Sequence, residues 1–251
     1  DIDILILIEK EPNDGNRGYI ERFVGMLWDL GLEVGHSVRT PAQCQSESEQ
    51  DVTVRTVLLE ARFIAGERKL FQNLAKDTIF AIDAPAFLTA KRLEQEQRHE
   101  KYQDSPYSLE PNIKEAPGGL RDLQIVRWIA LACEYKGTWT DLSNRGFITH
   151  GEAIEARRHE SFLNELRVRL HYLAGRREDR LLFDYQERLA RDLGFVATRA
   201  KRASELLMQR YYRTAKSITQ LNTLLLQNLE SALRGNDQFD PRRIKIGRAH
   251  V

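Results

Sequence analysis

The chain has 251 residues, of which 41% are hydrophobic and 30% are charged, and its formal net charge is +1. This length and apolar content suffice for one large domain or two small ones with a buried core, and the low counts of 15 glycines and 7 prolines exclude collagen-like and low-complexity proteins. No apolar run approaches the roughly 20 residues of a membrane-spanning helix, so we expect a cytoplasmic protein with no membrane partner.

The cysteines and the distribution of charge narrow the protein class further. Cys44 and Cys133 lie far apart without a CxxC or histidine-rich companion, so we expect neither a disulfide nor a zinc site and place the protein in a reducing compartment. The near-neutral charge gives no reason to expect a nucleic-acid partner. Residues 157–213 are nevertheless rich in arginine, which predicts either solvated helix faces or a docking face for an anionic partner.

The beginning of the chain predicts a strand and then a helix. Apart from Asp3, residues 2–8 are apolar and mostly β-branched, as in a strand that is central in a sheet and covered on both faces. Residues 13–16 are typical of a loop. Five apolar residues then recur at helical spacing and predict a helix that packs on the sheet and ends at Gly31. They are Tyr19, Phe23, Met26, Leu27 and Leu30.

A second strand and shorter elements follow. Residues 32–38 alternate between polar and apolar side chains, as in a strand, and we expect His36 on it to be buried with its hydrogen bonds satisfied. Residues 40–50 are polar with a Thr-Pro start and predict a short exposed helix or a loop. Residues 51–61 fit a strand or a helix equally well, and residues 66–76 fit a helix.

Long charged helices replace strands after residues 82–85. We therefore expect a mostly helical α+β protein with one domain over residues 1–84 and a helical domain over residues 85–240. Residue 1 is Asp rather than Met and lies directly at a strand pattern, so we expect the native start to lie upstream. Residues 246–251 resemble a translated sequencing adapter, and we exclude this tail from the fold.

The helical domain shows two strong helix signals. Thr149 followed by Glu152 predicts a capping box at the start of one helix, which ends at Gly175. The last helix continues until Gly235 and is expected to pack against a helical bundle. The apolar stripe of the first helix is Phe162, Leu163, Leu166, Leu170 and Leu173, and that of the second is Leu207, Tyr211, Ala215, Ile218, Leu221, Leu225 and Leu229.

Asp1 and Asp3 are the first candidate catalytic residues. Side chains repeat on one face of a strand every second residue, so both carboxylates, with Cα atoms about 7 Å apart, can reach one metal cluster. Two hard divalent cations held by carboxylates serve phosphoryl and nucleotidyl transfer. The alternative is a pair of acids at an exposed strand end. Glu60 is the better candidate for a third carboxylate and Asp51 the second, although helix capping explains Asp51 better.

Residues 109–124 contain the second candidate site. Pro117, Gly118 and Gly119 open a helix whose exposed amides could receive a phosphate, and Lys114 and Arg121 would supply positive charge. The alternative interpretation is a structural turn in which Arg121 forms an ordinary ion pair with Asp122.

Six segments together resemble one enzyme family. In order, they are residues 1–3, 31–40, 58–62, 98–102, 109–124 and 178–184. They are similar to the bifunctional uridylyltransferase/uridylyl-removing enzymes that modify the nitrogen-regulatory protein PII. The resemblance covers residues 1 to about 230.

The resemblance implies a polymerase-β-like nucleotidyltransferase sheet followed by an α-helical bundle domain. The implied reaction moves UMP from UTP to a tyrosine of PII, with Asp1 and Asp3 binding Mg²⁺ or Mn²⁺ and Glu60 completing the acidic set. The family places a Gly-Ser phosphate-binding turn before the two aspartates, and hydrolytic HD and sensory ACT domains after the helical region. None of these occurs in the chain, so we expect a fragment of the transferase half that is inactive alone.

Two other functions are consistent with parts of the sequence. An adenylyltransferase acting on glutamine synthetase shares the paired aspartates, but residues 109–124 argue against it. In a catalytically silent partner-binding module, the helical domain would dock a regulatory partner and the acidic strand end would have no catalytic role. The presence of Asp1, Asp3 and Glu60 argues against this function.

Overall fold

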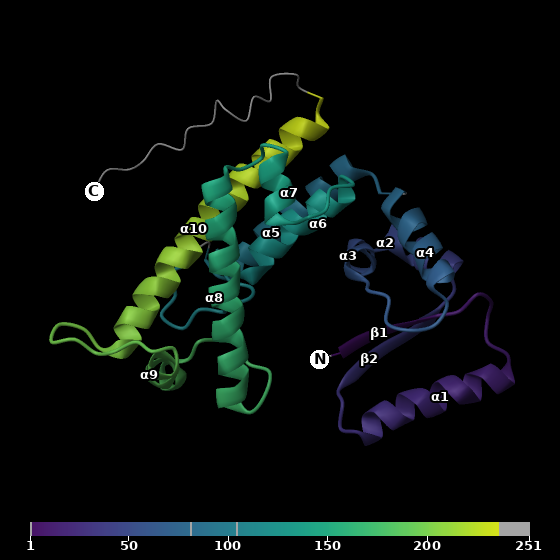
Figure 1. Ribbon diagram of the computed structural model, residues 1–251, viewed down its shortest axis with the longest axis horizontal. Helices are drawn as coiled ribbons and strands as arrows, with labels where there is room; N and C mark the ends of the chain where they lie inside the picture. The colour runs from purple at the N-terminus through teal and green to yellow at the C-terminus, as the bar shows by residue number, and fades with distance from the viewer. Residues whose placement is uncertain (1, 81, 104, 236–251) are drawn as a thin grey trace. The chain divides into compact units, whose positions relative to one another are not determined.

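A computed structural model of the chain describes residues 2–80, 82–103 and 105–235 (Figure 1). The described residues divide between Ile82 and Asp83 into two compact units, here called the N-terminal unit and the C-terminal unit. Among these residues, no helix combines the length and the apolar character needed to cross a membrane. The predicted adapter-like tail, residues 246–251, lies outside the described residues.

The N-terminal unit is a small sheet with helices on both faces. Its elements are β1 (Ile2–Leu7), α1 (Asp14–Asp29), β2 (Val34–Arg39), α2 (Pro41–Gln50), α3 (Val52–Glu60) and α4 (Arg68–Phe80). The strands β1 and β2 are parallel, with Asp3 paired to Gly35 and Leu7 to Arg39. Helix α1 covers one face of the sheet, and α2, α3 and α4 lie on the other (Figure 1).

Local capping explains where the short helices of this unit begin. Thr40 and Gln43 form a capping box at the start of α2, with Pro41 in the first turn. The Asp51 carboxylate accepts a hydrogen bond from the Thr53 amide at 2.6 Å and caps α3. Residues 51–61, which the pattern left open, are therefore helical. A core of Cys44, Leu58 and Leu74 forms beneath these helices, and Leu5, Leu7 and Val54 pack against it.

The prediction that β1 is central in its sheet is wrong for the described residues, although helices lie on both faces of the sheet, as expected. There β1 pairs with β2 alone, and its first residue, Ile2, is 43% exposed. A continuous apolar run shows that a strand has helices or strands near both faces, but it does not reveal how many strands flank it.

The prediction for α1 is wrong about which face meets the sheet. Tyr19 and Met26, expected against the sheet, are 68% and 53% exposed. Val24 is buried instead, and Trp28 places its ring 5.7 Å from His36 on β2. Helix α1 carries apolar residues on two faces, so its periodicity could not decide between them. His36, expected to be buried, is exposed beside Trp28.

The C-terminal unit consists of helices. They are α5 (Ala84–Glu100), α6 (Leu120–Ala132), α7 (Trp139–Asn144), α8 (His150–Ala174), α9 (Phe183–Asp192) and α10 (Ala203–Leu233). The long helix α10 packs against α5, α6, α8 and α9. The predicted apolar stripes of α8 and α10 are confirmed as buried, except that Leu173 is partly exposed. The predicted capping box of Thr149 and Glu152 is also confirmed, as is the end of α8 at Gly175, which has a φ of +64°.

Candidate functional site

The first candidate site lies at the start of β1. Because side chains alternate along a strand, Asp3 shares a face with Leu5 and Leu7, which pack against the core beneath α2, α3 and α4. Asp3 is exposed, and no hydrogen bond or ion pair joins its carboxylate to another described residue. An exposed carboxylate without a protein partner is available to a metal ion. Asp1, the other predicted ligand, lies outside the described residues.

Gly35 makes room for this carboxylate. It pairs with Asp3 across the sheet, and a Cβ atom at Gly35 would lie 2.5 Å from Asp3 Oδ1. The hydrogen side chain of Gly35 therefore lets the carboxylate lie across β2. The sequence analysis missed this residue, although a single glycine inside a strand pattern is a known signal of a close approach.

We predict that Gly35→Ala leaves the fold intact and weakens metal binding. The new methyl group would meet only the flexible end of the Asp3 side chain, which can rotate away from it. In the full-length protein, the dissociation constant for Mg²⁺ should rise about tenfold, the usual effect of losing support for a metal ligand. Gly25→Ala is the matched control, since nothing lies within 4 Å of its Cβ position. An unchanged dissociation constant for Mg²⁺ in Gly35→Ala would contradict this role.

The third carboxylate of the predicted acidic set stays a prediction. Glu60 is exposed at the end of α3, which lies on the face of the sheet that carries Asp3. Among the described residues, which omit Asp1, no three His, Cys, Asp or Glu side chains lie close enough to hold a metal ion. Asp51 caps α3, as its alternative interpretation predicted.

The second candidate site begins with the loop that precedes α6. The Arg121 amide donates to the Lys114 carbonyl oxygen at 2.9 Å, and the Gly119 amide donates to that of Ala116 at 2.8 Å. The Gly118 amide donates to Asp122 Oδ2 at 2.7 Å. The prediction that these amides are exposed to receive a phosphate is therefore wrong. They are buried and already bonded within the loop.

Packing explains why both glycines occur in this loop. Gly118 has a φ of +76°, and a Cβ atom there would lie 2.2 Å from the Ala215 carbonyl oxygen of α10. A Cβ atom on Gly119 would lie 2.7 Å from the Lys114 carbonyl oxygen. Only glycine allows the loop to approach α10 this closely at residue 118 and to fold back on itself this tightly at residue 119, so we assign both residues a structural role.

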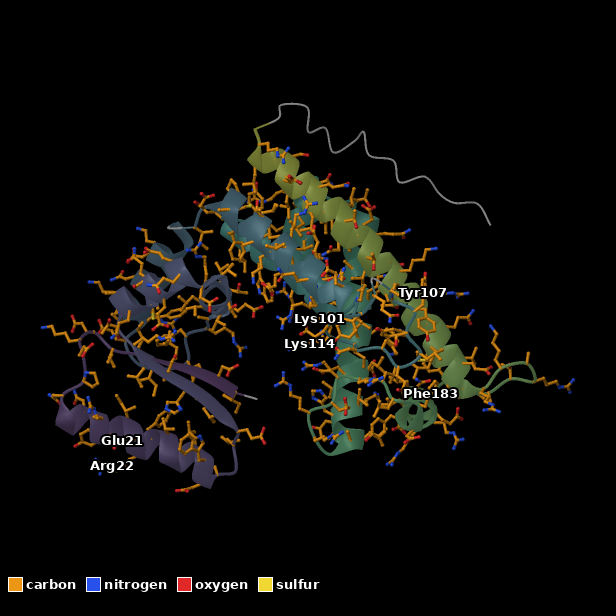
Figure 2. All side chains as sticks on the ribbon, turned by 180° about the vertical axis from the view of Figure 1, so that it is seen from behind. Glu21, Arg22, Lys101, Tyr107, Lys114 and Phe183 are labelled. Carbon is orange, nitrogen blue, oxygen red and sulfur yellow. The ribbon has the colours of Figure 1, made fainter. Side chains whose placement is uncertain are left out.

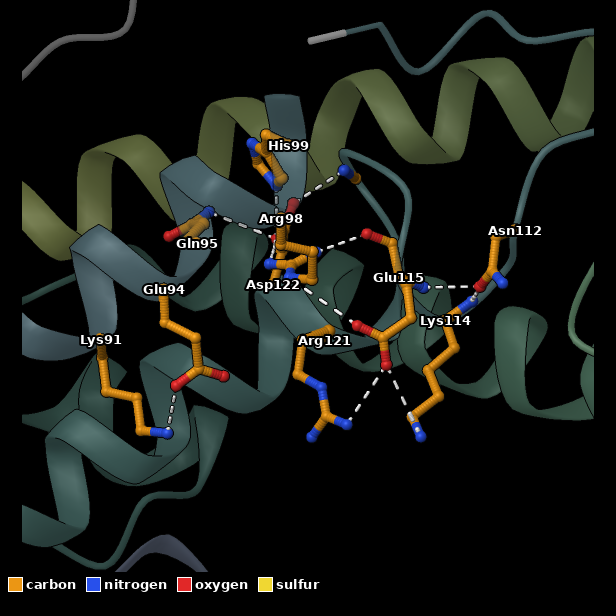
Figure 3. Close-up of polar contacts among 11 residues, drawn as sticks. Lys91, Glu94, Gln95, Arg98, His99, Asn112, Lys114, Glu115, Arg121 and Asp122 are labelled. Atoms are coloured by element: carbon orange, nitrogen blue, oxygen red, sulfur yellow. Dashed lines mark hydrogen bonds and ion pairs between the residues drawn. The ribbon is translucent and has the colours of Figure 1, made fainter. Parts of the chain in front are cut away.

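Asp122 is the centre of a buried polar network (Figure 3). Its side chain is 0% exposed, and Oδ1 accepts hydrogen bonds from Arg98 Nη2 at 2.5 Å, His99 Nε2 at 2.9 Å and Gln95 Nε2 at 3.2 Å. His99 must be the donor, because an ionised carboxylate only accepts. Asn222 on α10 donates to the Asp122 carbonyl oxygen at 2.7 Å. The network thus ties α5, α6 and α10 together.

The charge of Asp122 is maintained by these partners. Burial by itself would raise the pKa of Asp122, but the hydrogen bond from His99 and the positive charge of Arg98 outweigh it and hold that pKa below its ordinary value. The alternative interpretation of this segment, in which Arg121 pairs with Asp122, is wrong about the partner. Arg121 forms an ion pair with Glu115 at 3.2 Å.

Glu115 is the carboxylate that lies beside both predicted basic residues. Lys114 Nζ lies 3.6 Å from Glu115 Oε1, and Arg98 Nε lies 3.8 Å from Oε2 (Figure 3). The Arg121 guanidinium also lies over the ring of Trp128, 5.1 Å from its centroid. Lys114 and Arg121 are therefore brought side by side, as their proposed joint role requires.

Comparisons with known proteins point to one family. A family model described as GlnD PII-uridylyltransferase matches residues 86–226. Proteins named bifunctional uridylyltransferase/uridylyl-removing enzyme from Burkholderia lata and Burkholderia vietnamiensis are each 56% identical to the chain, and that from Burkholderia pseudomallei is 55% identical. Each alignment covers 93% of this chain and 27% of the relative, so the chain spans about a quarter of their length. No solved structure matches the chain.

Proposed function

The chain belongs to the GlnD PII-uridylyltransferase family, and we propose that it carries the transferase site of such an enzyme, moving UMP from UTP to a tyrosine of the protein PII. The observation that carries this proposal is the 56% identity to a protein named uridylyltransferase/uridylyl-removing enzyme over 93% of the chain. The exposed carboxylate of Asp3, which lies at a strand end and has no partner among the described residues, supports it independently.

Three carboxylates form the proposed metal site. Asp1, Asp3 and Glu60 would hold Mg²⁺ or Mn²⁺, which in nucleotidyl transfer polarises the α-phosphate and favours attack by the tyrosine oxygen. Gly35 leaves room for the Asp3 carboxylate beside β2. Lys114 and Arg121 are proposed to bind the nucleotide or the partner through their side chains, since the neighbouring amides are occupied.

The experiment that tests this function uses the full-length protein that contains this chain. With PII, UTP labelled at the α-phosphate and Mg²⁺, the label should appear on a PII tyrosine. With glutamine synthetase and labelled ATP in place of PII and UTP, no label should transfer. Transfer only in the second mixture would replace the proposal with the adenylyltransferase alternative.

The chain by itself should transfer no label to PII. It spans 27% of its relatives, and the resemblance places a phosphate-binding turn and further domains outside these residues. The same assay with residues 1–251 measures this directly. Sustained turnover by the chain alone would show that the other segments are dispensable.

A further inference from the structure

Three basic side chains from separate elements gather on the C-terminal unit. Lys114 lies in the loop before α6, Arg121 in the first turn of α6, and Arg167 in the middle of α8. The Ile113 amide donates to the Asp179 carbonyl oxygen at 2.8 Å, and Arg167 Nε contacts Asp179 Oδ1 at 2.5 Å. These contacts hold Arg167 of α8 beside the loop that carries Lys114.

The cluster has more positive than negative charge and is open to solvent. Its three cations face two carboxylates, those of Glu115 and Asp179. The side chains of Lys114, Arg121 and Arg167 keep 18%, 23% and 27% of their surface exposed. A small anion can therefore reach all three without unfolding the unit.

Lys114 and Arg121 keep hydrogen-bond donors unused. The Lys114 ammonium lies 3.6 Å from its nearest carboxylate oxygen, too far for a hydrogen bond, and no described residue accepts one from it. Among the described residues, the Arg121 side chain donates one hydrogen bond, from Nη2 to Glu115. Burial, and then the charges of Arg121 and Arg167, lower the pKa of Lys114. A nearby negative charge would relieve this repulsion.

We propose that Lys114, Arg121 and Arg167 form a phosphate-binding site in which the side chains alone supply the donors. Arg167 is a new member of this set, and sequence spacing did not indicate it. In the described part of the chain, Arg167 bonds Asp179 through Nε and Nη2 and leaves Nη1 for a phosphate oxygen, Arg121 leaves Nε and Nη1, and Lys114 adds a point charge. That the bound phosphate belongs to UTP rests on the proposed function, whereas the binding of phosphate itself does not.

The first test measures binding of inorganic triphosphate to residues 1–251 by calorimetry, without metal ions and at low ionic strength. We expect measurable binding that Lys114→Met and Arg167→Met each weaken about tenfold, the effect of losing about 1.4 kcal/mol of a charge-assisted contact. Arg158→Met, on the same helix and with a side chain 71% exposed, should not change it. UTP should bind and uridine should not. No binding to the wild type, or equal binding to all variants, would overturn the site.

A second test needs no substitution. It remains informative if Arg167→Met disturbs the fold, which could happen because this substitution removes one partner of Asp179. Triphosphate should slow acylation of the Lys114 amine, followed by mass spectrometry, but not that of the exposed Lys101 (Figure 2). Equal rates at Lys114 with and without triphosphate would overturn the proposal. These assays use no PII and no metal, so failure of the transferase proposal would leave their outcome unchanged.

Discussion

Asp3→Asn should abolish UMP transfer by the full-length protein while leaving the fold almost unchanged. Asparagine keeps the size of the side chain but loses the negative charge that a divalent cation needs. A metal ion contributes several kcal/mol to the transition state of such reactions, so the rate should fall at least about a hundredfold. Asp3 is exposed and has no described partner, so the melting temperature should stay within about 2 °C of the wild type. Labelled transfer and thermal unfolding measure the two effects.

Asp29→Asn is the control for this variant. Asp29 is an exposed acid at the end of α1, in the same unit, and the proposed chemistry gives it no role. Its transfer rate should equal that of the wild type. Full transfer by Asp3→Asn would remove Asp3 from the metal site.

Asp122→Asn should strongly destabilise the C-terminal unit. The Asp122 carboxylate is fully buried and neutralises Arg98, which is only 8% exposed. Removing one partner of a buried ion pair leaves the other charge uncompensated and costs about 3–5 kcal/mol. For a protein of this size the melting temperature should fall by roughly 10 °C. Glu155→Gln, which breaks the exposed pair with Arg158, should cost less than about 1 kcal/mol.

The same carboxylate gives an expected acid dependence. The pKa of Asp122 is lower in the folded protein than its ordinary value of 3.8. The unfolded chain therefore binds a proton at Asp122 more readily than the folded protein does. The ionised carboxylate contributes its full stabilisation above about pH 4, and this contribution is lost as the pH falls through the pKa that Asp122 has in the folded protein. Urea unfolding between pH 6 and 3 should show a shallower loss of stability for Asp122→Asn than for the wild type. If the free energy of unfolding fell equally with pH in both proteins, the ionisation of Asp122 would not contribute to the acid dependence.

The motifs in the sequence identified the family without any coordinates. The segments around Asp3, Glu60 and residues 109–124 occur in a fixed order, and the comparisons confirm the family that they indicated. The metal site itself is still a prediction, because Asp1 lies outside the described residues. Gly35 escaped notice because its role depends on the strand beside it.

The sequence by itself determined most of the helices. Capping and 3.6-residue periodicity are local properties, so the capping box at Thr149, the αL end at Gly175 and the buried stripe of α10 could all be predicted from neighbouring residues. Periodicity became ambiguous where a segment carried apolar residues on more than one face. This is why the sheet-facing side of α1 was predicted wrongly.

Only the tertiary structure decided which charged groups meet. Asp122 takes its partners from α5 rather than from adjacent Arg121, and Arg167 reaches the loop of Lys114 from more than fifty residues away in the sequence. The amides that had looked available to phosphate are likewise occupied, by carbonyl oxygens of the loop and by the Asp122 carboxylate. Such pairings depend on how helices that are distant in the sequence pack together. The spacing of side chains along one segment contains no information about which other segment will lie beside it.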